Sequence, residues 1–331
     1  MILVTGATGF LGGHVIRQLI DAGHQVVALS RYGFRPETRF LLADDIERVP
    51  LCVVPAGDES AVRGVFETYR PDSVVHLDAL VDVVELSTQP LKAIETNFLP
   101  TVALLELARE FGVETFVYAS SIAVLPTIQY EPITARHPVL LEVEGPGGGF
   151  YGASKVASEV FALEYAASFG LNVRIVRPSA IYGFGMQWPI GLKPLVEGGV
   201  DGRKIDLGEG VMPARDFTHV ADVAGIIERL VITRDAEDRL FFAATGNALI
   251  SESALIDTVR GLLPELEVRF APRGDDVPES KYRGVIDMSP VRDQLDYSLR
   301  FPRLKDGLAE YIDQYRRYRA ASAAAQCGRH G

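Results

Sequence analysis

The sequence of 331 residues contains few cysteines, no long apolar run and fewer basic than acidic residues. Its two cysteines, Cys52 and Cys327, are far apart and match no metal-binding or redox spacing, which excludes a disulfide framework. No apolar stretch approaches the ~20 residues that a membrane-spanning helix needs. The 33 basic and 44 acidic residues give a net charge of −11, which disfavours nucleic acid and anionic membranes as main partners.

The scarcity of cysteine suits a reducing compartment, and the first residues show no basic segment followed by a cleavage site. We therefore expect a cytoplasmic protein. Apolar residues make up 47% of the chain, which is enough to build packed cores and excludes global disorder. At ~100–200 residues per domain, the length predicts about two domains.

Short apolar runs alternate with helical patterns over the first half of the chain. The runs lie at 2–4, 25–29, 51–54, 73–77, 115–119 and 173–176, and helices are expected near 59–69, 91–111 and 152–169. Continuous apolar strands separated by helices are typical of a parallel sheet covered on both faces. We therefore predict an α/β fold with a Rossmann-type doubly wound parallel sheet, whose ligand binds at the carboxyl ends of the strands.

A glycine-rich turn joins the first predicted strand to the first helix. In the segment TGATGFLG, residues 5–12, the glycines allow backbone N–H groups and the helix N-terminus to approach a pyrophosphate. The alternative is a tight strand-to-helix turn that binds no ligand. The position directly after an N-terminal strand favours a dinucleotide site. Its predicted residues are Gly6, Thr8, Gly9, Phe10, Leu11 and Gly12.

The second strand ends at Ser30 and Arg31, where an NAD-binding domain usually carries an acidic residue for the ribose hydroxyls. Arg31 could accommodate a 2′-phosphate, which favours NADP over NAD, or could be a solvated loop cation. After the third strand, Asp58 could accept a hydrogen bond from an adenine amino group or belong to an ordinary turn.

The regular alternation weakens after about residue 178, where proline and glycine become frequent. We predict an NAD(P)-binding domain of residues 1–177 with returning segments near 215–245. Residues 178–214 and 246–319 are expected to form a smaller, mixed C-terminal lobe for the substrate. The alanine-rich segment 320–331 is predicted to be a flexible, fraying helix.

Tyr151 and Lys155 lie at the start of a predicted helix, after a glycine-rich loop. Their spacing puts the phenol and the ammonium group on one helix face, and a nearby cation lowers the pKa of a tyrosine so that it can act as a general base. An exposed tyrosine and lysine on a helix are the alternative. Ser120 and Ser121 end the preceding strand, where a hydroxyl could bond a substrate oxygen or cap a turn.

The order of these motifs resembles the extended short-chain dehydrogenases/reductases of the NAD-dependent epimerase/dehydratase family. The resemblance covers residue 2 to about residue 297, nearly the whole chain. Further matching motifs are the segments 57–58, 75–77, 116–121, 177–178, 182–183, 215–224 and 287–297, together with Asn97.

The resemblance implies roles for the matching residues. Tyr151 would be the catalytic acid and base, Lys155 would lower its pKa and hold the nicotinamide ribose, and Ser121 would position the reacting oxygen. Arg215 and Arg273 would contact a substrate diphosphate, although structural ion pairs with acidic residues are the alternative. No metal is expected. Other residues implied at the cofactor site are Leu77, Ala79, Asn97 and Pro178.

Several positions depart from the family pattern, among them Leu125 and Pro126, which replace the usual Tyr-Gly. Ile122 and Ala123 replace the acidic pair of the dehydratases, which argues against 4,6-dehydration. Ala180 replaces an asparagine that helps to hold the phosphates of a sugar nucleotide. Asp78 stands where alanine is usual, and its carboxylate would either meet a local donor or touch the substrate.

Three functions are consistent with these residues. The first is an NAD(P)-dependent epimerase of a sugar or nucleotide sugar, which forms a transient keto intermediate and returns the hydride to its other face. The second is an NADP-dependent dehydrogenase or reductase of a sugar-like or other hydroxyl or carbonyl substrate, mildly favoured by Arg31 and Ala180. The third, a non-catalytic dinucleotide sensor, is disfavoured by the intact Tyr151, Lys155 and Ser121. The family resemblance also implies a homodimer.

Overall fold

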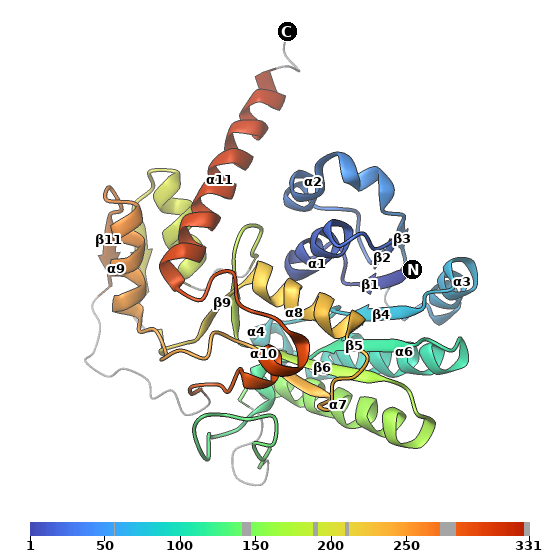
Figure 1. The fold of residues 1–331 in the computed structure, drawn as a ribbon. Helices are drawn as coiled ribbons and strands as arrows, with labels where there is room; N and C mark the ends of the chain where they lie inside the picture. Colours follow the sequence, from blue (N-terminus) through green and yellow to red (C-terminus); the bar gives the residue numbers. More distant parts are fainter. Residues whose placement is uncertain (56, 141–146, 188–190, 209–211, 272–282, 328–331) are drawn as a thin grey trace.

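A seven-stranded parallel sheet forms the centre of the larger part of the molecule (Figure 1). The computed structural model describes residues 1–55, 57–140, 147–187, 191–208, 212–271 and 283–327. The strand order is β10-β6-β5-β4-β1-β2-β3, which confirms the Rossmann-type fold. The strands are β1 (Ile2–Thr5), β2 (Val26–Ser30), β3 (Leu51–Val53), β4 (Ser73–His76), β5 (Thr115–Ala119), β6 (Val173–Pro178) and β10 (Leu240–Ala243).

Both faces of the sheet are buried under helices, because successive strand residues point to opposite sides. Ile2 and Val4 of β1 belong to the core under α1 and α8, whereas Leu3 belongs to the core under α3, α6 and α7. The helices on the first face are α1 (Phe10–Asp21), α8 (Val220–Ile232) and α10 (Ser289–Leu295). Those on the second face are α3 (Glu59–Tyr69), α6 (Leu99–Glu110) and α7 (Gly149–Phe169).

The helix expected near 91–111 is interrupted. It consists of α5 (Pro90–Lys92), a π-helical segment η2 (Ala93–Phe98) and α6. Pro100 lies in the first turn of α6, where a proline ring is tolerated because that N–H has no partner inside the helix. The shorter remaining helices are α2 (Pro36–Leu42), η1 (Ala43–Arg48), α4 (Val83–Thr88) and η3 (Ile122–Val124).

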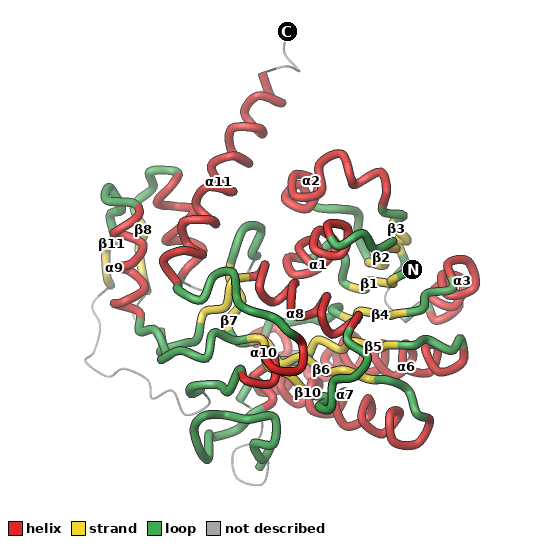
Figure 2. Tube along the Cα trace, viewed as in Figure 1, coloured by secondary structure: helices red, strands yellow, loops and turns green. Residues whose placement is uncertain are grey.

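A smaller lobe packs beside the sheet and has its own core (Figure 2). Over the described part of the chain, no helix is long and apolar enough to cross a membrane. Two short parallel strand pairs, β7–β9 and β8–β11, accompany the helices of the lobe. Its elements are β7 (Ala180–Tyr182), η4 (Pro194–Gly198), β8 (Ile205–Leu207), β9 (Phe217–His219), α9 (Glu252–Leu262), β11 (Val268–Phe270) and α11 (Leu304–Cys327).

Aromatic side chains join the two parts of the molecule. Phe40 of α2 lies edge-on to Phe184, with ring centroids 5.5 Å apart, and to Tyr318 of α11, at 5.4 Å. Phe10, at the start of α1, also packs against the core of the lobe. Helix α10 lies between two lobe elements in the sequence, but its Val291 and Leu295 pack under the main sheet. The two cores are therefore interleaved along the chain.

Candidate active site

The glycine turn after β1 requires glycine at two positions. Gly6 has a φ of +65°, and a Cβ atom there would lie 2.8 Å from the backbone nitrogen of Asp78. A Cβ atom at Gly12 would lie 2.2 Å from the carbonyl oxygen of Gly6. The first turn of α1 is thereby held against the carboxyl ends of β1 and β4 with no side chain in between. A turn of this shape leaves room for a pyrophosphate at the N-terminus of the helix.

A groove runs from this turn along the carboxyl ends of the strands to the start of α7. It holds about 1720 Å³ of space free of protein atoms, part of it open to solvent. Most of the residues predicted for the cofactor site line it. These are Gly6, Thr8, Gly9, Phe10, Leu11, Gly12, Ser30, Arg31, Leu77, Ala79, Tyr151, Lys155 and Pro178.

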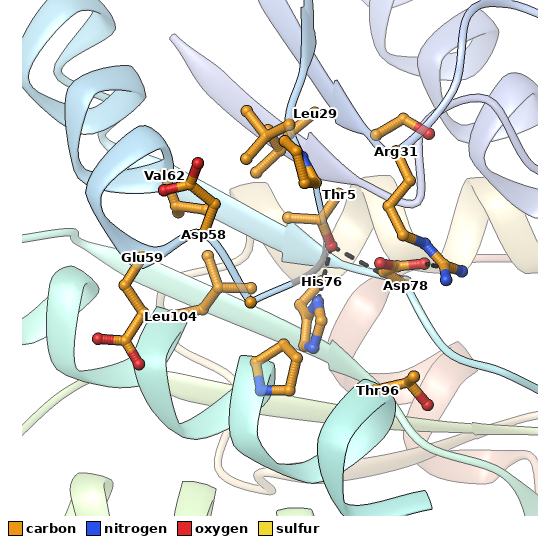
Figure 3. A pocket seen from close by; sticks show the side chains of 15 residues that line it. Thr5, Leu29, Arg31, Asp58, Glu59, Val62, His76, Asp78, Thr96 and Leu104 are labelled. Carbon is orange, nitrogen blue, oxygen red and sulfur yellow. Dashed lines mark hydrogen bonds and ion pairs between the residues drawn. The ribbon is translucent and has the colours of Figure 1, made fainter. Parts of the chain in front are cut away.

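A second, mostly apolar cavity adjoins the groove beyond the end of β2 (Figure 3). Its walls include Leu29, Val62 and Leu104, which suit a flat aromatic ring. Asp58 lies at its edge and caps α3, because its carboxylate accepts a hydrogen bond from the Ala61 N–H at 2.9 Å. The role of Asp58 toward an adenine amino group stays a prediction.

Tyr151 and Ser121 come together from α7 and from the end of β5. Burial raises the pKa of the Tyr151 phenol to about 12, and the neighbouring Ser121 hydroxyl acts in the opposite direction. The sequence predicts instead that Lys155 lowers the pKa of Tyr151, but in the structure desolvation outweighs any such effect. The phenol is therefore protonated at neutral pH. Ser121 also caps η3 by accepting a hydrogen bond from the Ala123 N–H at 3.1 Å.

The ammonium group of Lys155 is enclosed and held in one place. Its Nζ donates to the carbonyl oxygen of Ala119 at 2.7 Å and lies 4.8 Å from the ring centre of Tyr118. Burial lowers the pKa of Lys155 to about 8, while the carboxylates of Asp78 and Glu159 raise it. Lys155 is thus a cation whose charge is easily lost unless an anion or a dipole in the groove supports it.

Asn97 supports the groove from behind. Its side-chain amide accepts from the Leu80 N–H at 2.7 Å and donates to the Leu80 carbonyl at 3.0 Å, and it also donates to the Ser154 hydroxyl at 3.1 Å. Asn97 therefore ties the loop after β4 to α7. The buried His76 bonds the hydroxyl groups of Thr5 and Thr101, and burial lowers its pKa to about 3. It is a neutral structural residue.

Arg31 and Asp78 form an ion pair, with 3.6 Å between Nη2 and Oδ1 (Figure 3). Of the two roles that the sequence leaves open for Asp78, the structure shows the first, contact with a local donor. Ser30 has another partner, because its hydroxyl lies 2.6 Å from that of Thr8 in the glycine turn. The end of β2 is thus connected to both the glycine turn and the loop after β4.

Arg215 lies just before β9, and its backbone pairs with Ile250 in both directions. Its half-buried guanidinium has no carboxylate partner among the described residues, and its Nε makes no hydrogen bond there. Burial and, to a smaller extent, the charge of Arg283 lower the pKa of Arg215 to about 10. Arg283 is thus the described cation whose charge acts on Arg215. Arg273, which the family resemblance implies for this place, lies outside the described residues.

Sequence reasoning named Ser120 beside Ser121 but missed two arginines. Ser120 lines the groove with a buried hydroxyl that has no hydrogen-bond partner in the described part of the chain. Arg35 lines it as well, four positions after Arg31, and that spacing was an available signal. Arg283 had a weaker signal, as a basic residue directly before the motif at 287–297. The described residues contain no group of three or more His, Cys, Asp and Glu side chains that could hold a metal ion.

Comparison with known proteins gives consistent matches. The family model described as the NAD dependent epimerase/dehydratase family matches residues 2–239. A dTDP-4-dehydro-6-deoxy-D-allose reductase from a Streptomyces species is 30% identical over 327 residues, 95% of this chain and 96% of the relative. A dTDP-glucose 4,6-dehydratase from Streptomyces griseus is 30% identical over 329 residues, 96% of this chain and 95% of the relative.

A solved structure extends the likeness to three dimensions. The UDP-glucose 4-epimerase of Thermus thermophilus, in complex with NAD, matches with a TM-score of 0.77 and 25% identity, over 95% of this chain and 98% of that one. These proteins carry out different net reactions on nucleotide sugars, so the likeness defines the family and not the reaction. Because the family model covers well over half of the sequence, the chain belongs to the NAD dependent epimerase/dehydratase family, an extended short-chain dehydrogenase/reductase enzyme.

Proposed function

We propose that this enzyme is an NAD-dependent epimerase of a nucleoside diphosphate sugar. The observation that carries the proposal is the pairing of the Tyr151 phenol with Ser121, beside an enclosed lysine at the end of the groove. A tyrosine beside a second hydroxyl can exchange a proton with a substrate oxygen in both directions by alternating between phenol and phenolate, as epimerisation requires. The non-acidic Ile122 and Ala123 after Ser121 disfavour dehydration.

Each side chain then has a separate task. Tyr151, in its phenolate form, takes the proton of the substrate hydroxyl when that carbon is oxidised, and as the phenol it gives the proton back when the carbon is reduced. Ser121 holds the substrate oxygen beside the phenol. Lys155, fixed on the carbonyl oxygen of Ala119, stabilises the phenolate by its charge. When bound, the nicotinamide of the cofactor supplies the hydride acceptor and donor that these side chains lack.

The groove and the adjoining cavity are consistent with a dinucleotide. Glycines at the turn leave the pyrophosphate position open, and the apolar cavity suits an adenine ring. The sequence favours NADP through Arg31. However, Arg31 has a carboxylate partner in Asp78, and the Thermus thermophilus relative was solved with NAD. We therefore propose NAD as the cofactor.

The proposed substrate carries a diphosphate, which Arg215 and Arg283 would bind. Two half-buried arginines with no carboxylate partner among the described residues form a strongly cationic place in an acidic protein. Guanidinium groups bind phosphate oxygens through charge-assisted, often bidentate, hydrogen bonds. Arg215 comes just before β9, and β9 pairs with β7. Strand β7 begins two residues after Pro178, which lines the groove.

The experiment compares product formation with cofactor balance. The purified chain is denatured to release and identify any bound dinucleotide, and then incubated with UDP-glucose and with dTDP-glucose. We expect NAD to be retained and an epimer to form without net consumption of NAD or NADH. Tyr151→Phe should lower turnover by about 10²–10⁴-fold. Tyr165→Phe, on the same helix but bonded to Glu106, is the matched control and should retain turnover.

A reductase with net turnover is the second candidate, because the Streptomyces reductase is 30% identical along nearly the whole chain. Tyr151 would then act only as a proton donor, a role that suits its raised pKa. Rapid exchange of the dinucleotide, with one NADPH oxidised for each 4-keto sugar reduced, would establish this reaction and exclude the epimerase.

The helices α6 and α7 provide a surface for a homodimer. Large apolar side chains are exposed along them, among them Leu99, Val160, Phe161 and Phe169. The ring of Phe161 also packs edge-on to Phe98, with centroids 5.0 Å apart. Exposed apolar patches of this kind typically mark association sites. Sedimentation of the wild-type chain should give the mass of a dimer, and Phe161→Glu should shift it to the mass of a monomer.

A further inference from the structure

The ion pair between Arg31 and Asp78 lies where the adenine cavity meets the main groove. Both residues, together with Ser30, line both spaces. Figure 3 shows the pair at the wall of the adenine cavity. In the sheet, Thr5 at the end of β1 is in register with Leu29 of β2 and His76 of β4. The pair therefore bridges the two loops on either side of β1. A dinucleotide with its adenine in the cavity and its pyrophosphate at the glycine turn would have its adenine ribose at this junction.

The backbone of Asp78 is fixed in this position. Its N–H donates to the Thr5 hydroxyl at 3.4 Å, and its backbone nitrogen lies so close to Gly6 that a side chain there would not fit. Two residues further on, Asn97 holds both backbone groups of Leu80. The Asp78 carboxylate can therefore rotate, but it cannot leave the junction without disturbing the glycine turn.

The two charges depend mainly on each other. Burial raises the pKa of Asp78, while Arg31 and, more weakly, Lys155 lower it. In the described part of the chain, no other carboxylate lies within ion-pair distance of Arg31. The side chains are 31% and 32% exposed, so the pair remains accessible to a ligand. Arg31 is thus paired with a carboxylate but is still accessible to a ligand.

We propose that Asp78 sets the cofactor preference of this enzyme, by occupying Arg31 so that the groove binds NAD in preference to NADP. This inference rests on the proposed dinucleotide function. A 2′-phosphate carries up to two negative charges and needs a cation at the end of β2. Here it would have to displace the Asp78 carboxylate from Arg31 and remain close to it, which like-charge repulsion opposes.

The same carboxylate favours the unphosphorylated ribose. NAD-binding domains usually hold the ribose hydroxyls with an acidic residue at the end of β2, but that place is Ser30 here. Asp78 supplies a carboxylate to the same junction from the end of β4 instead. Asp78 is then both the acceptor for the ribose hydroxyls and the counter-ion of Arg31, and both roles favour NAD.

The test measures binding of cofactor and of its adenosine half by isothermal titration calorimetry. The probes are NAD, NADP, 5′-AMP and 2′,5′-ADP, and the proteins are wild type, Asp78→Asn, Asp78→Ala, Arg31→Ala and the double variant Arg31→Ala/Asp78→Asn. We expect Asp78→Asn and Asp78→Ala to shift the ratio of dissociation constants by about tenfold toward NADP and 2′,5′-ADP. In the Arg31→Ala background, the same Asp78→Asn change should shift the ratio much less.

Asp82→Asn is the matched control. Asp82 also lines the groove, but its carboxylate caps α4 by accepting from the N–H groups of Val84 and Glu85. Asparagine preserves this cap and removes the same unit of charge. An equal shift with Asp82→Asn, or no shift with either Asp78 variant, would overturn the inference while leaving the dinucleotide function in place. Failure of the wild-type chain to bind any of the four nucleotides would overturn the proposed function and this inference with it.

Discussion

Two arginine sites in this enzyme have opposite surroundings. Arg177 of β6 makes a bidentate pair with Glu159 of α7, at 2.8 and 2.6 Å, and both side chains are almost completely buried. Arg215 has no such partner in the described chain, and the charge that acts on its pKa is that of another arginine, Arg283. The first arginine is neutralised within the fold, whereas the second is left with an uncompensated charge.

The difference separates structural from functional cations. The charge of Arg177 is balanced by a bidentate carboxylate, so Arg177 fastens α7 to the sheet one turn after Lys155. A desolvated charge near a like charge is unfavourable until an anion arrives, and this is why we propose a ligand site at Arg215 and Arg283. Lys155 is intermediate, because Asp78 and Glu159 support it without bonding it directly.

The largest effect on stability is expected for Arg177, the structural arginine. Arg177→Met leaves Glu159 buried without its cation and should lower the free energy of unfolding by about 3–5 kcal/mol, measured by urea denaturation. The double variant Arg177→Met/Glu159→Leu removes both charges and should recover most of that loss. A single variant as stable as the wild type would mean that the pair does not fasten α7.

Lys155→Met tests the intermediate case, and the quantity to measure is the free energy of unfolding as a function of pH. The pKa of Lys155 is lowered from 10.5 to about 8, so below pH 8 the folded chain holds a buried charge that destabilises it. This penalty disappears as pH rises from 8 to 10.5, because the folded state loses its proton before the unfolded state does. The stability of Lys155→Met relative to wild type should therefore fall across this interval, by up to ~3 kcal/mol. A pH-independent difference would contradict the burial of a charged lysine.

Arg215→Met should affect binding more than folding. We expect the affinity for a nucleoside diphosphate such as UDP to fall about 10–100-fold, since a charge-assisted hydrogen bond contributes about 1.5–3 kcal/mol. The urea midpoint should stay constant or rise, because an uncompensated charge is removed. Arg283→Met is the companion variant and should behave in the same way. A loss of stability without a loss of UDP affinity would make Arg215 a structural residue like Arg177.

The smallest effect is expected for a solvent-exposed pair. Arg63 bonds both carboxylate oxygens of Glu110, at 2.6 and 2.8 Å, in the same bidentate arrangement as Arg177 and Glu159. Its side chain is 43% exposed, so water screens the interaction. Arg63→Met should leave the urea midpoint unchanged within error. A shift as large as that of Arg177→Met would show that geometry, and not burial, separates the two sites.

Local patterns predict the fold and the first half of the site well. Gly6 and Gly12 are identifiable in sequence because close backbone contacts exclude any side chain there, and the apolar runs mark six of the seven sheet strands. The spacing of Tyr151 and Lys155 predicts that both line one groove. These features depend on residues near one another in the chain, so a single sequence contains their signal.

Features that need distant segments were not predictable. Arg31 and Asp78 meet only because β1 lies between β2 and β4, and β10 joins the sheet from a segment that the sequence assigns only as returning to the domain. The raised pKa of Tyr151 depends on how deeply the folded groove encloses it. Likewise, no periodicity in the sequence indicates that Arg283 is the arginine whose charge acts on Arg215.

The aromatic contacts between the two parts of the molecule limit how far it can be treated as modular. Phe10 and Phe40 come from the first half of the chain but pack on the core of the lobe. In return, α10 contributes Val291 and Leu295 to the core under the sheet. A fragment ending near residue 177 would expose the first pair and lack the second. The nucleotide-binding half is therefore not a transplantable unit, and recombination with a relative should exchange Phe10 and Phe40 together with the lobe but keep α10 with the sheet.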